Sequence, residues 1–136
     1  YLPYLKELVQ KNELADRVHF RPFSKETPLA FAALDVFVMA SLSEPFGMVT
    51  IEALATARPV IGTNSGGTRE LLNYGQAGLL FSPKNADELK EAVKILYQDA
   101  SQREKLREQG EAWARENYSH IKQCEQVEEL LKELAK

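Results

Sequence analysis

The chain has 136 residues, of which 44% are hydrophobic and 27% charged, and its formal net charge is −3. This length suits a single domain with one hydrophobic core, and the net charge excludes a surface that binds nucleic acid or an anionic membrane through bulk positive charge. The single cysteine, Cys124, excludes an intrachain disulfide and a cysteine-cluster metal site, so we expect an incidental, buried or partly buried thiol in a cytoplasmic protein.

Short apolar runs alternate along the chain with segments of helical periodicity. The expected strands are 18–20, 36–39, 59–62 and 79–81. The expected helices are 2–15, 24–34, 46–56, 68–74, 86–98, 102–117 and 121–134. The alternation predicts an α/β fold, with a Rossmann-like parallel sheet and flanking helices. Because these strands make a small sheet, we expect one of its edges to be open or covered by something else.

Two glutamates, Glu44 and Glu52, flank the predicted start of the helix at 46–56. Gly47 lacks a side chain that would keep a ligand away from the backbone, and the first helical turn (48–50) carries amide groups without intrahelical partners. Such a helix start favours a phosphate, while each carboxylate can accept hydrogen bonds from hydroxyl groups. The stretch therefore suits a nucleotide sugar, with its diphosphate between two hydroxyl-rich ends. The alternative is that Glu44 only interacts with the helix dipole and that Glu52 is a solvated helix residue.

Further motifs extend this pattern along the chain. They are Asp35-Val-Phe-Val-Met-Ala-Ser, Glu44-Pro-Phe-Gly-Met-Val-Thr-Ile-Glu-Ala-Leu-Ala, Arg58-Pro-Val-Ile-Gly, Gly66-Gly67-Thr-Arg-Glu70-Leu-Leu and Gly78-Leu-Leu-Phe. In order, spacing and residue type, residues 18–120 resemble the C-terminal, donor-binding domain of retaining GT-B glycosyltransferases of the group 1 type. That group contains sucrose-phosphate synthases, glycogen synthases and bacterial hexosyltransferases. The resemblance implies half of a GT-B fold, and transfer of a hexosyl group, with retention, from a nucleoside-diphosphate sugar to a hydroxyl acceptor.

The resemblance also implies a role for each residue of the predicted site. Glu44 is the expected catalytic residue, which binds hydroxyls of the donor sugar. The expected substrate-binding residues are Arg21, Phe46, Gly47, Met48, Val49, Glu52, Gly66 and Gly67. Among them, the amides of 46–49 would bind the sugar and the diphosphate, Glu52 the ribose, and the loop at Arg21 the nucleobase, while 66–67 would shape the cleft. No metal, and no cofactor besides the donor substrate, is expected.

Two of these assignments have an ordinary structural alternative when the residues are taken alone. Arg21 fits an exposed loop arginine equally well. The segment Ser65-Gly66-Gly67-Thr68 also fits a plain turn from strand to helix, in which Thr68 caps the helix.

The resemblance implies, finally, that residues 1–136 are a partial domain of a longer chain, with 101–136 as closing helices. The first two strands of the domain and an N-terminal domain that holds the acceptor are expected outside it. We therefore expect donor binding but no turnover by this fragment alone, peripheral membrane contact only in the full enzyme, and self-association of the fragment through its uncovered sheet edge.

Three other functions fit the same architecture. A non-catalytic GT-B-like domain would bind without turnover, and a nucleotide-sugar epimerase would need further acids in its partner domain. A phosphorylase would need a lysine for pyridoxal phosphate, and the chain has no lysine between Lys25 and Lys84. The intact glutamates and Gly47 favour the transferase.

Overall fold

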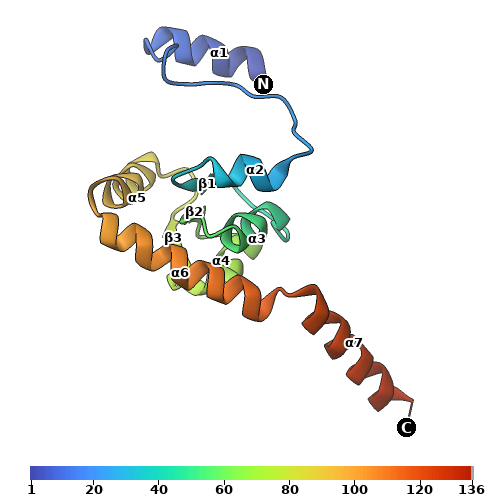
Figure 1. Cartoon of the computed structure of the whole chain (residues 1–136). Coiled ribbons are helices and arrows are strands. Elements are labelled where there is room, and N and C mark those ends of the chain that lie inside the picture. Colours follow the sequence, from blue (N-terminus) through green and yellow to red (C-terminus); the bar gives the residue numbers. More distant parts are fainter. Residues whose placement is uncertain (136) are drawn as a thin grey trace.

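The computed structural model describes residues 1–135 and contains a parallel sheet of three strands in the order β1-β2-β3 (Figure 1). The strands are β1 (Phe37–Met39), β2 (Val60–Thr63) and β3 (Leu79–Phe81). In the register of the sheet, Val38 lies opposite Ile61 and Gly62 lies opposite Leu80. The predicted α/β fold with a parallel sheet and flanking helices is confirmed.

Helices connect and flank the strands. They are α1 (Leu2–Lys11), α2 (Thr27–Ala32), α3 (Met48–Ala55), α4 (Gly66–Leu71), a 3-10 turn η1 (Asn73–Gly75), α5 (Ala86–Gln98), α6 (Ala100–Asn117) and α7 (His120–Leu134). The starts of α5 and α6 follow from side-chain caps, because Asn85 accepts a hydrogen bond from the amide of Glu88 and Asp99 accepts one from the amide of Gln102.

The central strand β2 is buried on both of its faces. Val60 packs in a cluster with Leu54 of α3, while its neighbour Ile61 points to the other face and packs with Leu96 of α5. All four of these side chains are fully buried. Helix α6 contributes to both clusters, which ties the two sides of the sheet together. Near its middle, a side chain at Gly110 would meet Leu54, so α6 can lie close against α3.

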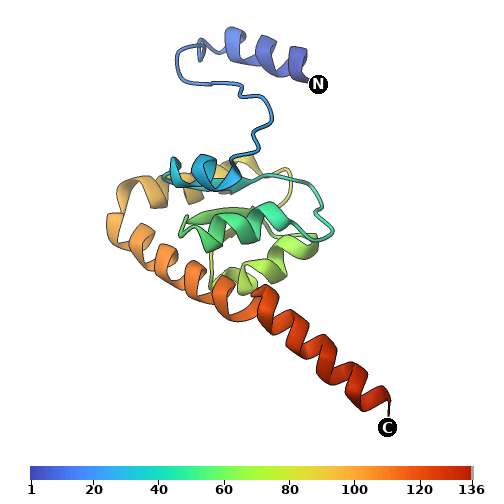
Figure 2. The same ribbon diagram turned by 45° about the vertical axis from the view of Figure 1, so that its right-hand side comes forward.

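The strand predicted at 18–20 does not form. Residues 12–26 connect α1 to α2 on the outside of the molecule, with turns at 12–17 and no regular structure at 18–20, which are exposed (Figures 1 and 2). A strand is stabilised by hydrogen bonds to a neighbouring strand, and within residues 1–135 no strand lies beside this segment. The sheet therefore has three strands rather than the four that were predicted.

The two terminal helices stand apart from the sheet. Neither α1 nor α7, both of which lie wholly within the described residues, has a buried residue. Figure 1 shows α1 separated from the strands and α7 projecting from the end of α6. Cys124 lies on α7 and is exposed, so the prediction of a buried or partly buried thiol was wrong. In the described part of the chain, no helix combines the length and the apolar character needed to cross a membrane.

Candidate functional site

Two loops meet at the carboxyl end of the sheet. One runs from β1 to α3 (residues 40–47), and the other runs from β2 to α4 (residues 64–65). In open parallel α/β sheets, ligands bind at this end of the strands. The first loop carries Glu44, and the second leads into Gly66 and Gly67, so the structure brings these three predicted residues together.

Three hydrogen bonds join the two segments at alternating positions. The hydroxyl of Thr63 donates to the carbonyl of Ser41 at 2.7 Å, and the hydroxyl of Ser65 donates to the carbonyl of Leu42 at 2.8 Å. The amide of Gly67 donates to the carbonyl of Glu44 at 2.8 Å. Residues 63, 65 and 67 thus hold the first loop by its carbonyl groups, and we call these three contacts the ladder.

The two glycines of the second segment are required for this close approach. A β-carbon at Gly66 would lie 2.6 Å from the carbonyl oxygen of Glu44, and one at Gly67 would lie 2.8 Å from that of Pro45. Gly66 also has φ +54, in the left-handed region that favours glycine. Packing between the two loops thus explains why both residues are glycines. If they shape a ligand cleft, as predicted, they do so by setting the position of the Glu44 loop.

Gly47 supports the side chain of Glu44 in a similar way. It occupies the N-cap position of α3 with φ 90 and ψ 52. A β-carbon there would lie 3.0 Å from Cγ of Glu44 and 3.1 Å from Cδ1 of Leu71. Any residue other than glycine would therefore be strained at this position and would displace Glu44.

The N-terminus of α3 is open. The amide of Thr50 donates to the carbonyl of Gly47 at 2.9 Å, but the amides of Met48 and Val49 have no acceptor within residues 1–135. Both residues are exposed, and the first turn contains no acidic side chain. Unpaired amides and the helix dipole make this end a favourable place for an anion.

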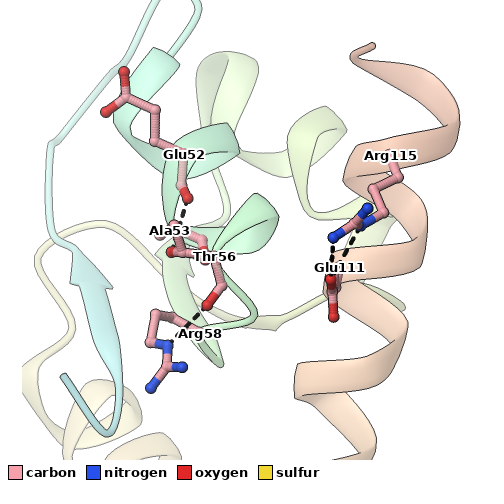
Figure 3. Close-up of polar contacts among 6 residues, drawn as sticks. All are labelled: Glu52, Ala53, Thr56, Arg58, Glu111 and Arg115. Atoms are coloured by element: carbon pink, nitrogen blue, oxygen red, sulfur yellow. Dashed lines mark hydrogen bonds and ion pairs between the residues drawn. The ribbon is translucent and has the colours of Figure 1, made fainter. Parts of the chain in front are cut away.

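The opposite end of the same helix is closed. The hydroxyl of Thr56 donates to the carbonyls of Glu52 and Ala53 at 2.9 and 3.0 Å, and Nε of Arg58 donates to the carbonyl of Thr56 at 3.0 Å (Figure 3). Figure 3 also shows the half-buried side chain of Glu52 directed away from Thr56 and Arg58. Its carboxylate makes no ion pair or hydrogen bond with another described residue, so it is available to a ligand.

Two buried hydroxyl groups near the site were not predicted. Oγ1 of Thr50, in the first turn of α3, and Oγ1 of Thr68, in α4, are buried and have no hydrogen-bond partner among the described residues. The prediction that Thr68 caps its helix was therefore wrong. The helix begins at Gly66, two residues earlier than expected, so Thr68 lies inside the helix. Ser65 takes the N-cap position, but its hydroxyl bonds to Leu42 instead.

Arg21 is not brought to this site. It is exposed in the segment between α1 and α2, and no hydrogen bond or ion pair among residues 1–135 joins it to either loop. Its predicted contact with a nucleobase stays a prediction.

The ends of α4 and α6 meet beside the site. Nε1 of Trp113 donates to the carbonyl of Leu71 at 3.0 Å, and the Trp113 ring packs edge-to-face against Tyr118. Burial raises the pKa of the Tyr118 hydroxyl, and the negative charge of Glu70 adds to the rise. These contacts fix α4, and with it Gly67, against the long helix.

Among residues 1–135, no three His, Cys, Asp or Glu side chains lie close enough to hold a metal ion.

Parallel strands whose carboxyl-end loops surround an open helix N-terminus are typical of nucleotide-binding α/β domains. Residues 1–113 match the model of the family described as glycosyl transferases group 1. The chain therefore belongs to this family. The resemblance predicted from the motifs is confirmed.

Individual relatives agree with this family assignment. The chain is 36% identical over 104 residues to a D-inositol 3-phosphate glycosyltransferase of Paenarthrobacter aurescens, covering 75% of this chain and 26% of that protein. It superposes on HepE from Anabaena in complex with UDP-glucose with a TM-score of 0.91 and 28% identity, over 98% of this chain and 37% of that one. The C-terminal domain of a group 1 glycosyl transferase from Francisella tularensis gives a TM-score of 0.76 and 28% identity, over 87% of this chain and 62% of that one. The chain thus spans about a quarter of the first relative and about a third of HepE.

Proposed function

We propose that this chain binds a nucleoside-diphosphate sugar as the donor-binding part of a longer retaining hexosyltransferase. The observation that carries the proposal is the open N-terminus of α3, which Glu44 precedes in the chain and Glu52 follows one turn later. The glycosyltransferase family supplies the reaction class. In the longer enzyme, the hexosyl group would pass to a hydroxyl acceptor, which is held by parts of the protein outside residues 1–136.

Each part of the site has a distinct proposed role. The amides of Met48 and Val49 bind the diphosphate, because they are the unpaired donors at the positive end of α3. Glu52, one helical turn after Met48, accepts hydrogen bonds from the ribose. Glu44 lies before the helix and accepts hydrogen bonds from hydroxyls of the transferred sugar. The ligand would then extend along the start of α3, with its charged centre at the amides.

This arrangement acts by position and electrostatics. The leaving diphosphate gains negative charge as the glycosidic bond to it breaks, and the fixed amides at the start of α3 are oriented to stabilise that charge. Glu44 orients the sugar for attack by the acceptor. Because the acceptor lies elsewhere, we propose that this chain, on its own, binds the donor but catalyses no transfer.

UDP-glucose is the appropriate first probe, because the HepE structure was obtained with it. Isothermal titration of the chain with UDP-glucose should show saturable binding that Glu52→Ala weakens. A hydrogen bond to a charged acceptor contributes about 1.5–3 kcal/mol, so the loss should be roughly tenfold or more. Glu44→Ala should also weaken UDP-glucose binding, because the sugar loses an acceptor, and in the longer enzyme it should lower turnover as well.

The matched control is Glu111→Ala on α6. Glu111 makes an exposed ion pair with Arg115, 2.7 Å between nitrogen and oxygen, on a different helix (Figure 3). Exposed pairs of this kind contribute little, so this variant should bind UDP-glucose as the wild type does. Equal binding by the wild type and Glu52→Ala would remove Glu52 from the site.

A further inference from the structure

We propose that Thr63 and Ser65 are positioning residues for Glu44: through the ladder they fix the loop that holds the sugar end of the donor. This inference rests on the proposed function, since it takes Glu44 to be the residue that binds the sugar. From the sequence, Ser65 was only part of a segment expected to line the cleft, and Thr63 had no predicted role.

The Glu44 loop depends on the ladder for its position. No backbone amide of residues 40–46 donates a hydrogen bond to the described chain outside the sheet pairing. The carbonyls of Ser41, Leu42 and Glu44 are instead held by Thr63, Ser65 and the amide of Gly67. Most of the loop is exposed, so it has little packing that could replace these three bonds.

The contacts around the ladder fix Glu44 itself as well as the rest of the loop. Gly66 and Gly67 lie against the main-chain atoms of Glu44 and the residue after it, and Gly47 lies against Cγ of its side chain. The main chain of Glu44 is therefore clamped on one side by the ladder, and its side chain is directed by the start of α3. A loop freed from Ser65 would move the carboxylate relative to the helix.

Loss of the ladder should affect the two ends of the ligand differently. The amides of Met48 and Val49 belong to α3, which is held in place by the buried side chains of Ala53 and Leu54. Loss of the Ser65 hydroxyl should leave these amides where they are. It should therefore weaken binding of a ligand that carries the sugar and spare a ligand that ends at the diphosphate.

The experiment compares UDP-glucose with UDP on the wild-type chain and on Ser65→Ala, Ser65→Thr and Thr63→Val. A net hydrogen bond of the neutral kind corresponds to about a two- to tenfold change. Ser65→Ala should raise the Kd for UDP-glucose by about that factor and leave the Kd for UDP unchanged. Ser65→Thr, which keeps the hydroxyl, should restore wild-type binding. The matched control Ser101→Ala, at an exposed position in the first turn of α6, should change neither Kd.

A second readout does not depend on the ligand. The amide of Gly67 donates to Glu44, so its hydrogen exchange, followed by NMR, should accelerate in Ser65→Ala while the melting temperature changes little. Thr63 is fully buried, and Thr63→Val should accelerate the same exchange with a larger loss of stability. Unchanged Gly67 exchange in both variants would overturn the inference.

The binding results separate this inference from the proposed function. If Glu44→Ala leaves UDP-glucose binding unchanged, the sugar-binding role of Glu44 fails, and Gly67 exchange still decides whether the ladder holds the loop. If Glu44→Ala weakens UDP-glucose binding but Ser65→Ala does not, the proposed function stands and the positioning role of Ser65 is refuted.

Discussion

The substitution Gly66→Ala tests how tightly the two loops pack. A β-carbon at this position would lie 2.6 Å from the carbonyl oxygen and 3.1 Å from the amide nitrogen of Glu44. Both are backbone atoms, so the contact cannot be relieved by rotating a side chain. The loops would have to separate, and the hydrogen bond from Gly67 to Glu44 would be lost.

The expected loss of stability has two parts. A left-handed conformation costs a residue other than glycine about 1–2 kcal/mol, and the lost hydrogen bond adds about 1 kcal/mol. Gly66→Ala should therefore lower the free energy of unfolding by about 2–3 kcal/mol, measured by urea denaturation and far-UV circular dichroism.

Gly75→Ala is the matched control. Gly75 also has a positive φ, +97, but a β-carbon there would meet only Cδ1 of Leu80, at the ordinary contact distance of 3.8 Å. Its φ lies further from the left-handed minimum near +57 than that of Gly66 does, so the strain at Gly75 is at least as large. A larger loss in Gly66→Ala than in Gly75→Ala would therefore come from the packing against Glu44, whereas a loss below about 1 kcal/mol in Gly66→Ala would refute that packing, because left-handed strain alone costs about that much.

Three further predictions concern the rest of the fold. Thr68→Val should stabilise the domain by about 1 kcal/mol in urea denaturation, because it replaces a buried hydroxyl that lacks a partner with a methyl group; a destabilised variant would mean that the hydroxyl is satisfied. The pKa of Glu88 is lowered by a hydrogen bond from the Ser82 backbone, then by hydrogen bonds from the side chains of Ser82 and Asn85. The ionised Glu88 therefore stabilises the fold above its unfolded pKa, and this stabilisation is lost as the pH falls through the lower folded pKa. The melting temperature of Glu88→Gln should therefore depend less on pH, between about pH 5 and about pH 3, than that of the wild type. An unchanged pH dependence would show that these hydrogen bonds do not stabilise the fold. We also propose that the chain associates with itself, because Val38 in the edge strand β1 and the apolar residues of α1 and α7 are exposed; a monomer in light scattering at high protein concentration would contradict this.

The sequence predicted the elements whose signals are local. Residues 79–81 are a continuous apolar run, and they form β3 with the predicted bounds. The helix predicted at 86–98 also has its predicted bounds, because Asn85 and Glu88 cap its first turn. The open helix start after Gly47 was likewise predicted, although the helix begins at Met48 rather than at residue 46.

The sequence did not predict the features that depend on distant parts of the chain. Residues 18–20 have the composition of a strand, but strand formation requires a neighbouring strand. Thr68 has a typical capping side chain, but the helix begins at Gly66 and Ser65 takes the N-cap position. The bonds of Thr63 and Ser65 to the Glu44 loop join segments more than twenty residues apart, and no local pattern marks them.

The central claim is that the N-terminus of α3 binds the diphosphate of a nucleotide sugar. Titration of the chain with UDP and with uridine, followed by calorimetry and by the NMR signals of the Met48 and Val49 amides, tests it most directly. We predict that UDP binds more tightly than uridine and that UDP, unlike uridine, shifts both amide signals. Equal affinity for the two ligands, with unshifted amides, would contradict the claim.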